Sequence, residues 1–206
     1  MKIKAVIFDM DGVLLDSEPL NLEQIKEVCA SFGKELDDTY LSSLVGRSLH
    51  DTWPETARRL GGNISLAQYQ KALQSFPISS MKYKQALFPK IIDLLKWLKQ
   101  EEYKIALASS SSMATIERIL KACDIEHYFD VCLSGEMFSK SKPDPQIYVE
   151  TVLKLGLSPE ECIIVEDSAA GIEAGKRANI RVVARVDSRF GVDPYQADYQ
   201  VCHTYE

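Results

Sequence analysis

The sequence predicts an α/β protein in which a parallel sheet with covering helices carries an all-helical insertion. After residue 88, short apolar runs typical of buried parallel strands alternate with amphipathic helical patterns. Such alternation indicates a parallel sheet with helices packed on it. Between the first strand and this series, residues 17–84 show only helical and polar patterns interrupted by glycines. We therefore expect a helical insertion after the first strand.

The first predicted strand, Ala5–Phe8, is wholly apolar, and Gly12 permits a sharp turn soon after it. Later strands are predicted from similar apolar runs, and helices from apolar residues repeated on one stripe. In chain order, these elements are a helix over 89–101, a strand Lys104–Ser109, a helix containing Ile116, Ile119 and Leu120, a strand Val131–Ser134, a helix Gln146–Leu155, a strand that begins at Cys162 and ends in two adjacent carboxylates, and a strand over 181–184.

Composition excludes several functional classes. The 206 residues carry a formal net charge of −6, which argues against nonspecific binding of nucleic acid. No apolar stretch approaches the length of a membrane span. We expect no signal peptide, because the sequence passes from Lys4 to a charged aspartate within a few residues. The five cysteines and three histidines lack the spacing of zinc ligands. An odd number of cysteines favours a reducing, cytoplasmic location.

Asp9 and Asp11 follow the first strand directly. Side chains two residues apart on an extended backbone lie on the same side, so both carboxylates should project beyond the end of the strand. Ligand sites of open α/β sheets lie beyond the carboxyl ends of their strands. Two carboxylates there can hold a hard cation, although an acidic loop after a core strand is the alternative for this motif alone.

Three later segments add polar groups that complement this pair. Ser109 and Ser110 stand at the entrance of a predicted helix, where hydroxyls and free backbone N–H groups suit an anion, although such serines can simply cap the helix. Lys142 precedes a Pro-Asp-Pro segment whose stiff backbone can aim it, although a lone loop lysine is usually solvated. Glu166 and Asp167 end another predicted strand.

In order and context, these four segments resemble the four signature motifs of the haloacid dehalogenase-like (HAD) superfamily, and most closely those of the β-phosphoglucomutase-like phosphatases. The similarity spans nearly the whole chain, and four motifs in the right order are far more specific than any one of them. The resemblance implies a Rossmann-like catalytic core of residues 1–16 and 85–206. It also implies that residues 17–84 form a helical cap that closes over the active site.

The resemblance also implies a role for each motif residue. Asp9 would be the nucleophile that forms an aspartyl-phosphate, and Asp11 the general acid and base. Lys142 and Ser109 would hold the oxygens of the substrate phosphate, and Ser110 would be a further substrate-binding residue. A Mg²⁺ ion, favoured by oxygen-only ligands, would be bound by Asp9, the backbone carbonyl of Asp11, Glu166 and Asp167.

Substrate recognition is expected in the helical insertion. Gly46 and Arg47 match the family's substrate-recognition loop, and a guanidinium can hold a second phosphate or sugar oxygens; an ordinary surface arginine is the alternative. Asn21 stands where true β-phosphoglucomutases have a histidine that helps to position the acid/base aspartate. Because an amide does not titrate near neutral pH, this difference disfavours the mutase reaction.

Three functions are therefore compared. The first is a Mg²⁺-dependent phosphatase acting on a small phosphorylated metabolite, with a sugar phosphate preferred. The second is a β-phosphoglucomutase, an isomerase on the same scaffold, and the third is a catalytically silent module that binds phosphate esters. The expected partner is a small phosphorylated substrate rather than nucleic acid or membrane, and we expect a monomer or weak dimer.

Overall fold

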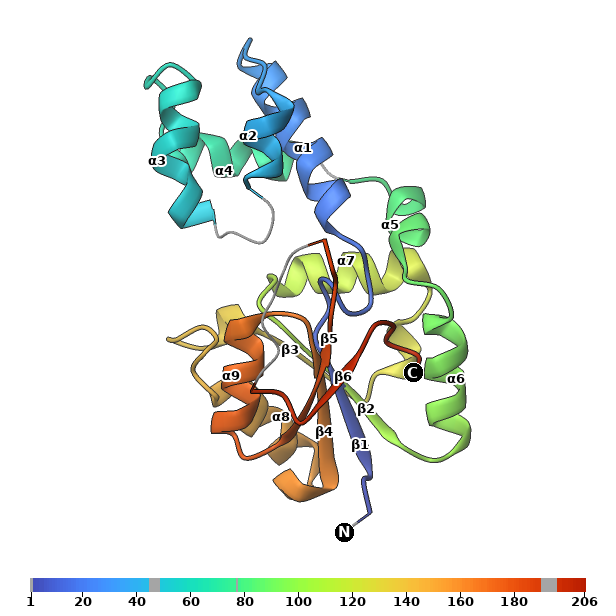
Figure 1. Cartoon of the computed structure of the whole chain (residues 1–206). Helices are drawn as coiled ribbons and strands as arrows, with labels where there is room; N and C mark the ends of the chain where they lie inside the picture. The colour runs from blue at the N-terminus through green and yellow to red at the C-terminus, as the bar shows by residue number, and fades with distance from the viewer. Residues whose placement is uncertain (1, 45–48, 77, 190–195) are drawn as a thin grey trace. The chain divides into compact units, whose positions relative to one another are not determined.

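The structure is a computed structural model that describes residues 2–44, 49–76, 78–189 and 196–206, with the side chain of His50 left out (Figure 1). The chain divides into two compact units. Residues 1–16 and 83–206 form the first, called the core unit, and residues 17–82 form the second, called the helical unit.

Within the described residues, the core unit contains a six-stranded parallel sheet with the strand order β3-β2-β1-β4-β5-β6. Strand β1 therefore lies between β2 and β4. The residues after β1 thus lie centrally along the side of the sheet where the carboxyl ends of the parallel strands meet. The strands are β1 (Ala5–Phe8), β2 (Lys104–Ser109), β3 (Val131–Ser134), β4 (Cys162–Glu166), β5 (Arg181–Arg185) and β6 (Tyr199–Val201).

Helices α8 and α9 cover one face of the sheet, and α6 lies on the other (Figure 1). Apolar residues of α8 and α9 pack against alternate residues of the central strands, including Ala5 and Ile7, to form the main core. The helical segments of this unit are α6 (Ile91–Gln100), α7 (Met113–Cys123), η1 (Glu126–Tyr128), η2 (Gly135–Met137), α8 (Gln146–Leu155), η3 (Pro159–Glu161) and α9 (Ala169–Arg177).

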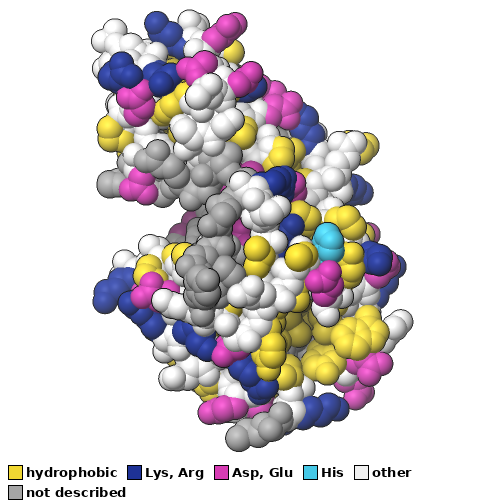
Figure 2. Space-filling view, viewed as in Figure 1, with side chains coloured by type: hydrophobic (Ala, Val, Ile, Leu, Met, Phe, Trp, Pro, Cys, Tyr) yellow, Lys and Arg dark blue, Asp and Glu magenta, His cyan; other side chains and the backbone are white. Residues whose placement is uncertain are grey.

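The face of the sheet that carries α6 is partly open. A groove of about 540 Å³ runs between α6 and β6, and its lining includes Phe8, Trp97 and Tyr199. Figure 2 shows hydrophobic side chains gathered beside α6 on this face. Trp97 and Tyr199 are each about half exposed, at 50% and 54% of their surface.

The helical unit has a core of its own. Val28, Cys29, Leu60 and Tyr69 are buried in it, and Trp53 packs on Tyr69 with 5.2 Å between ring centroids. A capping box at Ser65 starts α4. The helices are α1 (Glu18–Ser31), α2 (Asp38–Ser42), α3 (Leu49–Arg59) and α4 (Leu66–Ser75), followed by α5 (Ser80–Ala86), which contains the boundary between the units.

Two chain segments join the helical unit to the core unit, and both are paired inside the core unit. Leu15 and Leu87 form an antiparallel bridge. The N–H of Asp16 donates to the carbonyl of Ala86 at 2.8 Å, and that of Phe88 donates to the carbonyl of Leu14 at 3.0 Å. The entry and exit of the insertion are thus held side by side.

The predicted fold class is confirmed, including the helical insertion between β1 and β2. Three details differ from the prediction. The helix expected over 89–101 starts at Ile91 because Lys90 has a left-handed backbone with φ of 63°. Strand β5 extends one residue beyond 184, and the edge strand β6 was not predicted. In the described residues, no helix is long and apolar enough to cross a membrane.

Candidate active site

The predicted motif residues of the core unit meet at the carboxyl ends of β2, β1 and β4. Asp9 follows β1, and its N–H donates to the carbonyl of Val165 at 3.0 Å, which continues the pairing with β4. Ser109 ends β2, and Glu166 ends β4. Asp9, Ser109 and Glu166 are all buried. Neighbouring parallel strands thus deliver two carboxylates and a hydroxyl to one place.

Lys142 joins these strand ends through three hydrogen bonds. Its Nζ donates to Asp9 Oδ1 at 2.6 Å, to Glu166 Oε1 at 2.7 Å and to the carbonyl of Ala108 at 3.0 Å. Only 6% of the lysine side chain is exposed. Burial opposes the charged form, but the two carboxylates outweigh it, so the pKa of Lys142 lies well above its usual value. The lysine is a fixed cation next to Asp9.

Glu166 is surrounded by donors from the protein itself. Its Oε1 accepts from Lys142 and, at 2.9 Å, from the hydroxyl of the fully buried Tyr148. Its Oε2 accepts from the N–H groups of Asp167 and Ser168 and from the Ser168 hydroxyl. Burial favours the neutral acid, but Lys142 and these bonds lower the pKa of Glu166. This arrangement suits a residue that orients Lys142 better than one that contacts a metal directly.

Gly171 makes room for Glu166. A Cβ at this position would lie 1.7 Å from Glu166 Oε1. We expect Gly171→Ala to push the carboxylate away from Lys142, to lower the free energy of unfolding by about 1–3 kcal/mol and to reduce activity in the folded fraction. Urea unfolding and steady-state assays on one preparation measure both effects.

Gly175→Ala is the matched control, because Gly175 lies in α9 like Gly171. Its Cβ would lie 2.6 Å from Val182 Cγ2 and would overpack α9 at a point away from Glu166. It should lower stability but leave the activity of the folded protein intact. Equal activity losses in both variants would contradict the effect assigned to Glu166.

Asp11 lies on the loop after β1 and accepts a hydrogen bond from the Ser111 hydroxyl at its Oδ2, over 3.0 Å. The N–H of Ser111 donates to Ser109 Oγ at 3.1 Å, so both serines belong to one turn. Ser112 caps α7 by accepting from the N–H of Thr115, and Ser110 is exposed. The serines after β2 therefore have different environments.

Asp167 lies directly against the loop that carries Asp11. A Cβ at Gly12, which has φ of +73°, would be 1.7 Å from Asp167 Oδ2, so only glycine leaves room here. Burial raises the pKa of Asp167 to about 8, and the negative charge of Asp9 adds to this effect. Burial also raises the pKa of Asp9 to about 7, although Lys142 opposes the shift. Bound divalent cations relieve such repulsion between buried carboxylates, so this donor set fits Mg²⁺.

The four predicted metal ligands do not form a cluster of side chains. Among the residues described, no three His, Cys, Asp or Glu side chains converge as metal ligands. Glu166 is occupied by Lys142 and Tyr148, and Asp11 was expected to contribute only its backbone carbonyl. Asp9, Asp167 and that carbonyl remain the predicted ligands.

Residues from the end of the chain support the loop after β1, and sequence reasoning missed them. Arg185 Nη1 donates to the carbonyl of Gly12 at 2.8 Å, and its guanidinium lies 3.7 Å from the centroid of the Phe88 ring. The hydroxyl of Thr204 donates to the carbonyl of Val13 at 2.7 Å. The loop carrying Asp11 is thus held by hydrogen bonds from two distant parts of the core unit.

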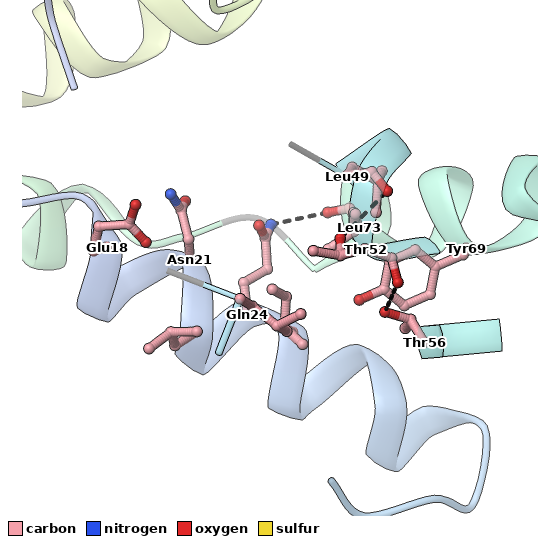
Figure 3. Close-up of a pocket in the computed structure, with 11 residues that line it drawn as sticks. Glu18, Asn21, Gln24, Leu49, Thr52, Thr56, Tyr69 and Leu73 are labelled. Atoms are coloured by element: carbon pink, nitrogen blue, oxygen red, sulfur yellow. Dashed lines mark hydrogen bonds between the residues drawn. The ribbon is translucent and has the colours of Figure 1, made fainter. Parts of the chain in front are cut away.

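The helical unit holds a separate pocket of about 220 Å³ (Figure 3). Asn21 and Glu18 on α1 line it together with Thr52 and Thr56 on α3. Asn21 itself is exposed. Gly46 and Arg47, the other predicted substrate-binding residues of this unit, lie outside the described residues, and their roles stay predictions.

A family model described as "Haloacid dehalogenase-like hydrolase" matches residues 6–185. The chain belongs to this family. Among curated relatives, it is 33% identical to "Phosphorylated carbohydrates phosphatase" of Thermotoga maritima, over 86% of this chain and 82% of the relative. It is also 33% identical to "Hexitol phosphatase B" of Escherichia coli, over 92% of this chain and 89% of the relative.

A solved structure from Thermotoga maritima, which carries a provisional beta-phosphoglucomutase assignment, shares the fold with a TM-score of 0.83. The two chains are 31% identical, and the similarity covers 97% of this chain and 94% of the other. The recognition of a HAD-like protein of the β-phosphoglucomutase-like group is thereby confirmed.

Proposed function

We propose that this HAD-family protein is a Mg²⁺-dependent phosphatase that hydrolyses a small phosphorylated carbohydrate through an aspartyl-phosphate on Asp9. The observation that carries the proposal is the contact of Lys142 with Asp9 and Glu166, because it joins a buried nucleophile to a fixed cation. Two relatives at 33% identity are named "Phosphorylated carbohydrates phosphatase" and "Hexitol phosphatase B", which supports this substrate class.

The proposed reaction has two displacements. A carboxylate oxygen of Asp9 attacks phosphorus while Asp11 gives its proton to the leaving oxygen. Asp11 then takes a proton from the water that attacks the aspartyl-phosphate. Lys142 and the Ser109 hydroxyl would hold the phosphoryl oxygens throughout.

Bound Mg²⁺ would offset the repulsion between the anionic nucleophile and the anionic phosphate. We assign Asp9, Asp167 and the carbonyl of Asp11 as its ligands, and we assign Glu166 to the positioning of Lys142. Arg47, Gly46, Asn21 and Ser110 are proposed to contact the rest of the substrate. The cytoplasmic location and the monomeric or weakly dimeric state stay predictions.

Removal of the metal should abolish turnover. We expect treatment with EDTA to lower the rate below about one hundredth of its starting value and added Mg²⁺ to restore it. Mg²⁺ should also raise the Tm of the unmodified protein, because it binds only the folded state. Thermal unfolding with and without Mg²⁺ checks this independently of activity.

The variant Asp167→Asn should lose most of this rise in Tm. Asp93→Asn on the exposed side of α6 is the control and should retain it. An equal Mg²⁺-dependent rise in Tm in both variants would show that Asp167 is not a ligand of the metal.

The β-phosphoglucomutase alternative is retained because of the provisional assignment of the similar Thermotoga maritima structure. Incubation with β-glucose 1-phosphate, Mg²⁺ and a trace of glucose 1,6-bisphosphate separates the two reactions. Release of free phosphate supports the phosphatase, whereas glucose 6-phosphate without free phosphate supports the mutase. If neither product forms, a panel of hexose, pentose and hexitol phosphates follows, and tight ester binding without hydrolysis of any member would support the silent module.

A further inference from the structure

We propose that Ser111 is a positioning residue that orients Asp11 for proton transfer to and from the substrate oxygen. The inference rests on the proposed phosphatase function and adds a residue to it. Its starting point is the hydrogen bond from the Ser111 hydroxyl to Asp11 Oδ2 at 3.0 Å, between residues 100 positions apart in the chain. Both residues belong to the core unit.

The backbone of Ser111 is held on two sides. Its N–H donates to Ser109 Oγ at 3.1 Å, and its carbonyl accepts from the hydroxyl of Ser134 at 2.7 Å. Ser134 is fully buried at the end of β3. A hydroxyl on such a fixed backbone has few directions open to it, so the contact with Asp11 is built into the turn.

The neighbouring η2 segment reinforces this turn. Glu136 Oε1 accepts from the N–H of Met113 at 3.0 Å, just beyond the serines. A Cβ at Gly135 would lie 3.2 Å from Ser110 Cα, so the two backbones approach closely here. Residues of η2 and β3 thus hold the backbone of the segment after β2, while the Ser111 hydroxyl contacts Asp11.

The position of the contact on Asp11 matters for the chemistry. Among the described residues, Ser111 is the only hydrogen-bond donor that the structure gives to this carboxylate, and it uses Oδ2 alone. The second oxygen, Oδ1, is left to carry the proton that moves. A carboxyl group whose rotation is restrained by one oxygen presents the other in a constant direction, which raises the chance of productive transfer.

The first displacement needs no atom or proton from Ser111. Asp9 forms a bond to phosphorus, the bond from phosphorus to the leaving oxygen breaks with its electron pair, and Asp11 supplies that oxygen with a proton. Ser111 neither gives nor takes a proton in this step. The loss of rate on removal of the Ser111 hydroxyl should therefore be larger for substrates whose leaving oxygen must be protonated as it departs.

This dependence defines the test. The quantity is kcat/KM, which covers the steps up to departure of the alcohol, for an alkyl ester (a hexose 6-phosphate) and an aryl ester (4-nitrophenyl phosphate). For Ser111→Ala, we expect kcat/KM to fall about tenfold or more with the alkyl ester and less than about threefold with the aryl ester, whose leaving group needs little protonation. Ser111→Thr retains a hydroxyl. It should restore the ratio of kcat/KM between the alkyl and the aryl ester to the value of the unmodified protein.

Ser112→Ala is the matched control, because Ser112 caps α7 and its loss should reduce stability without changing the ratio between the esters. Equal losses with both esters in Ser111→Ala would overturn the inference and show that Ser111 binds phosphate or supports the fold. If the unmodified protein hydrolyses neither ester nor any member of the phosphate-ester panel, the phosphatase assignment fails and the inference falls with it.

Discussion

Replacement of Asp9 by Asn is expected to reduce phosphate release by at least about 10⁴-fold, because an amide oxygen cannot form the aspartyl-phosphate. The change conserves the shape of the side chain. Lys142 retains Glu166 as a partner, so the site should still fold and still bind phosphate. Phosphate release measures the loss, and calorimetry with inorganic phosphate measures the binding that remains.

The control for Asp9→Asn is Asp38→Asn, the same change at a side chain that is 90% exposed in the helical unit. It should leave turnover unchanged. A phosphorylated enzyme trapped by rapid acid quenching should appear in the control protein and be absent from Asp9→Asn. Retained turnover in Asp9→Asn would remove Asp9 from the role of nucleophile.

Replacement of Lys142 by Met should affect both stability and function. It would leave Glu166 and Asp9 buried without their cation, and loss of one partner of a buried ion pair typically costs about 3–5 kcal/mol. The same change removes a proposed phosphate ligand, so activity should be lost as well. Urea unfolding at a fixed pH, monitored on the core unit, measures the change in stability.

Two further variants sharpen this experiment. Lys140→Met removes a lysine of the same loop whose side chain is 75% exposed, and its effect should be small. The double variant Lys142→Met with Glu166→Gln removes a charge of each sign and should recover part of the lost stability. If Lys142→Met alone were as stable as the unmodified protein, the buried ion pair would not support the fold.

Much of this architecture could be predicted because it depends on local patterns. Apolar runs such as Ala5–Phe8 indicate buried strands, and the ends of those strands carry the polar residues. Strand β6 escaped prediction because Tyr199–Val201 is short and two of its three side chains are exposed. It is recognisable only through its pairing with β5.

The supporting residues of the site were harder to predict because their contacts join distant segments. Tyr148 lies among the apolar residues of α8 and resembles any buried aromatic residue until its hydroxyl is seen to reach Glu166. Three neighbouring serines follow Ser109, and only the folded turn shows that Ser111 contacts Asp11 while Ser112 caps a helix. Such assignments require the direction of a side chain, which spacing alone does not contain.

The bridge between Leu15 and Leu87 has an evolutionary consequence. Because the two segments that lead to the insertion already meet inside the core unit, the strand order of the sheet does not depend on what connects them. Inserted segments of different length and sequence could be exchanged at this point while the catalytic residues after β1, β2 and β4 kept their places. In such a protein, substrate preference can diverge by replacement of a module while the chemistry is inherited unchanged.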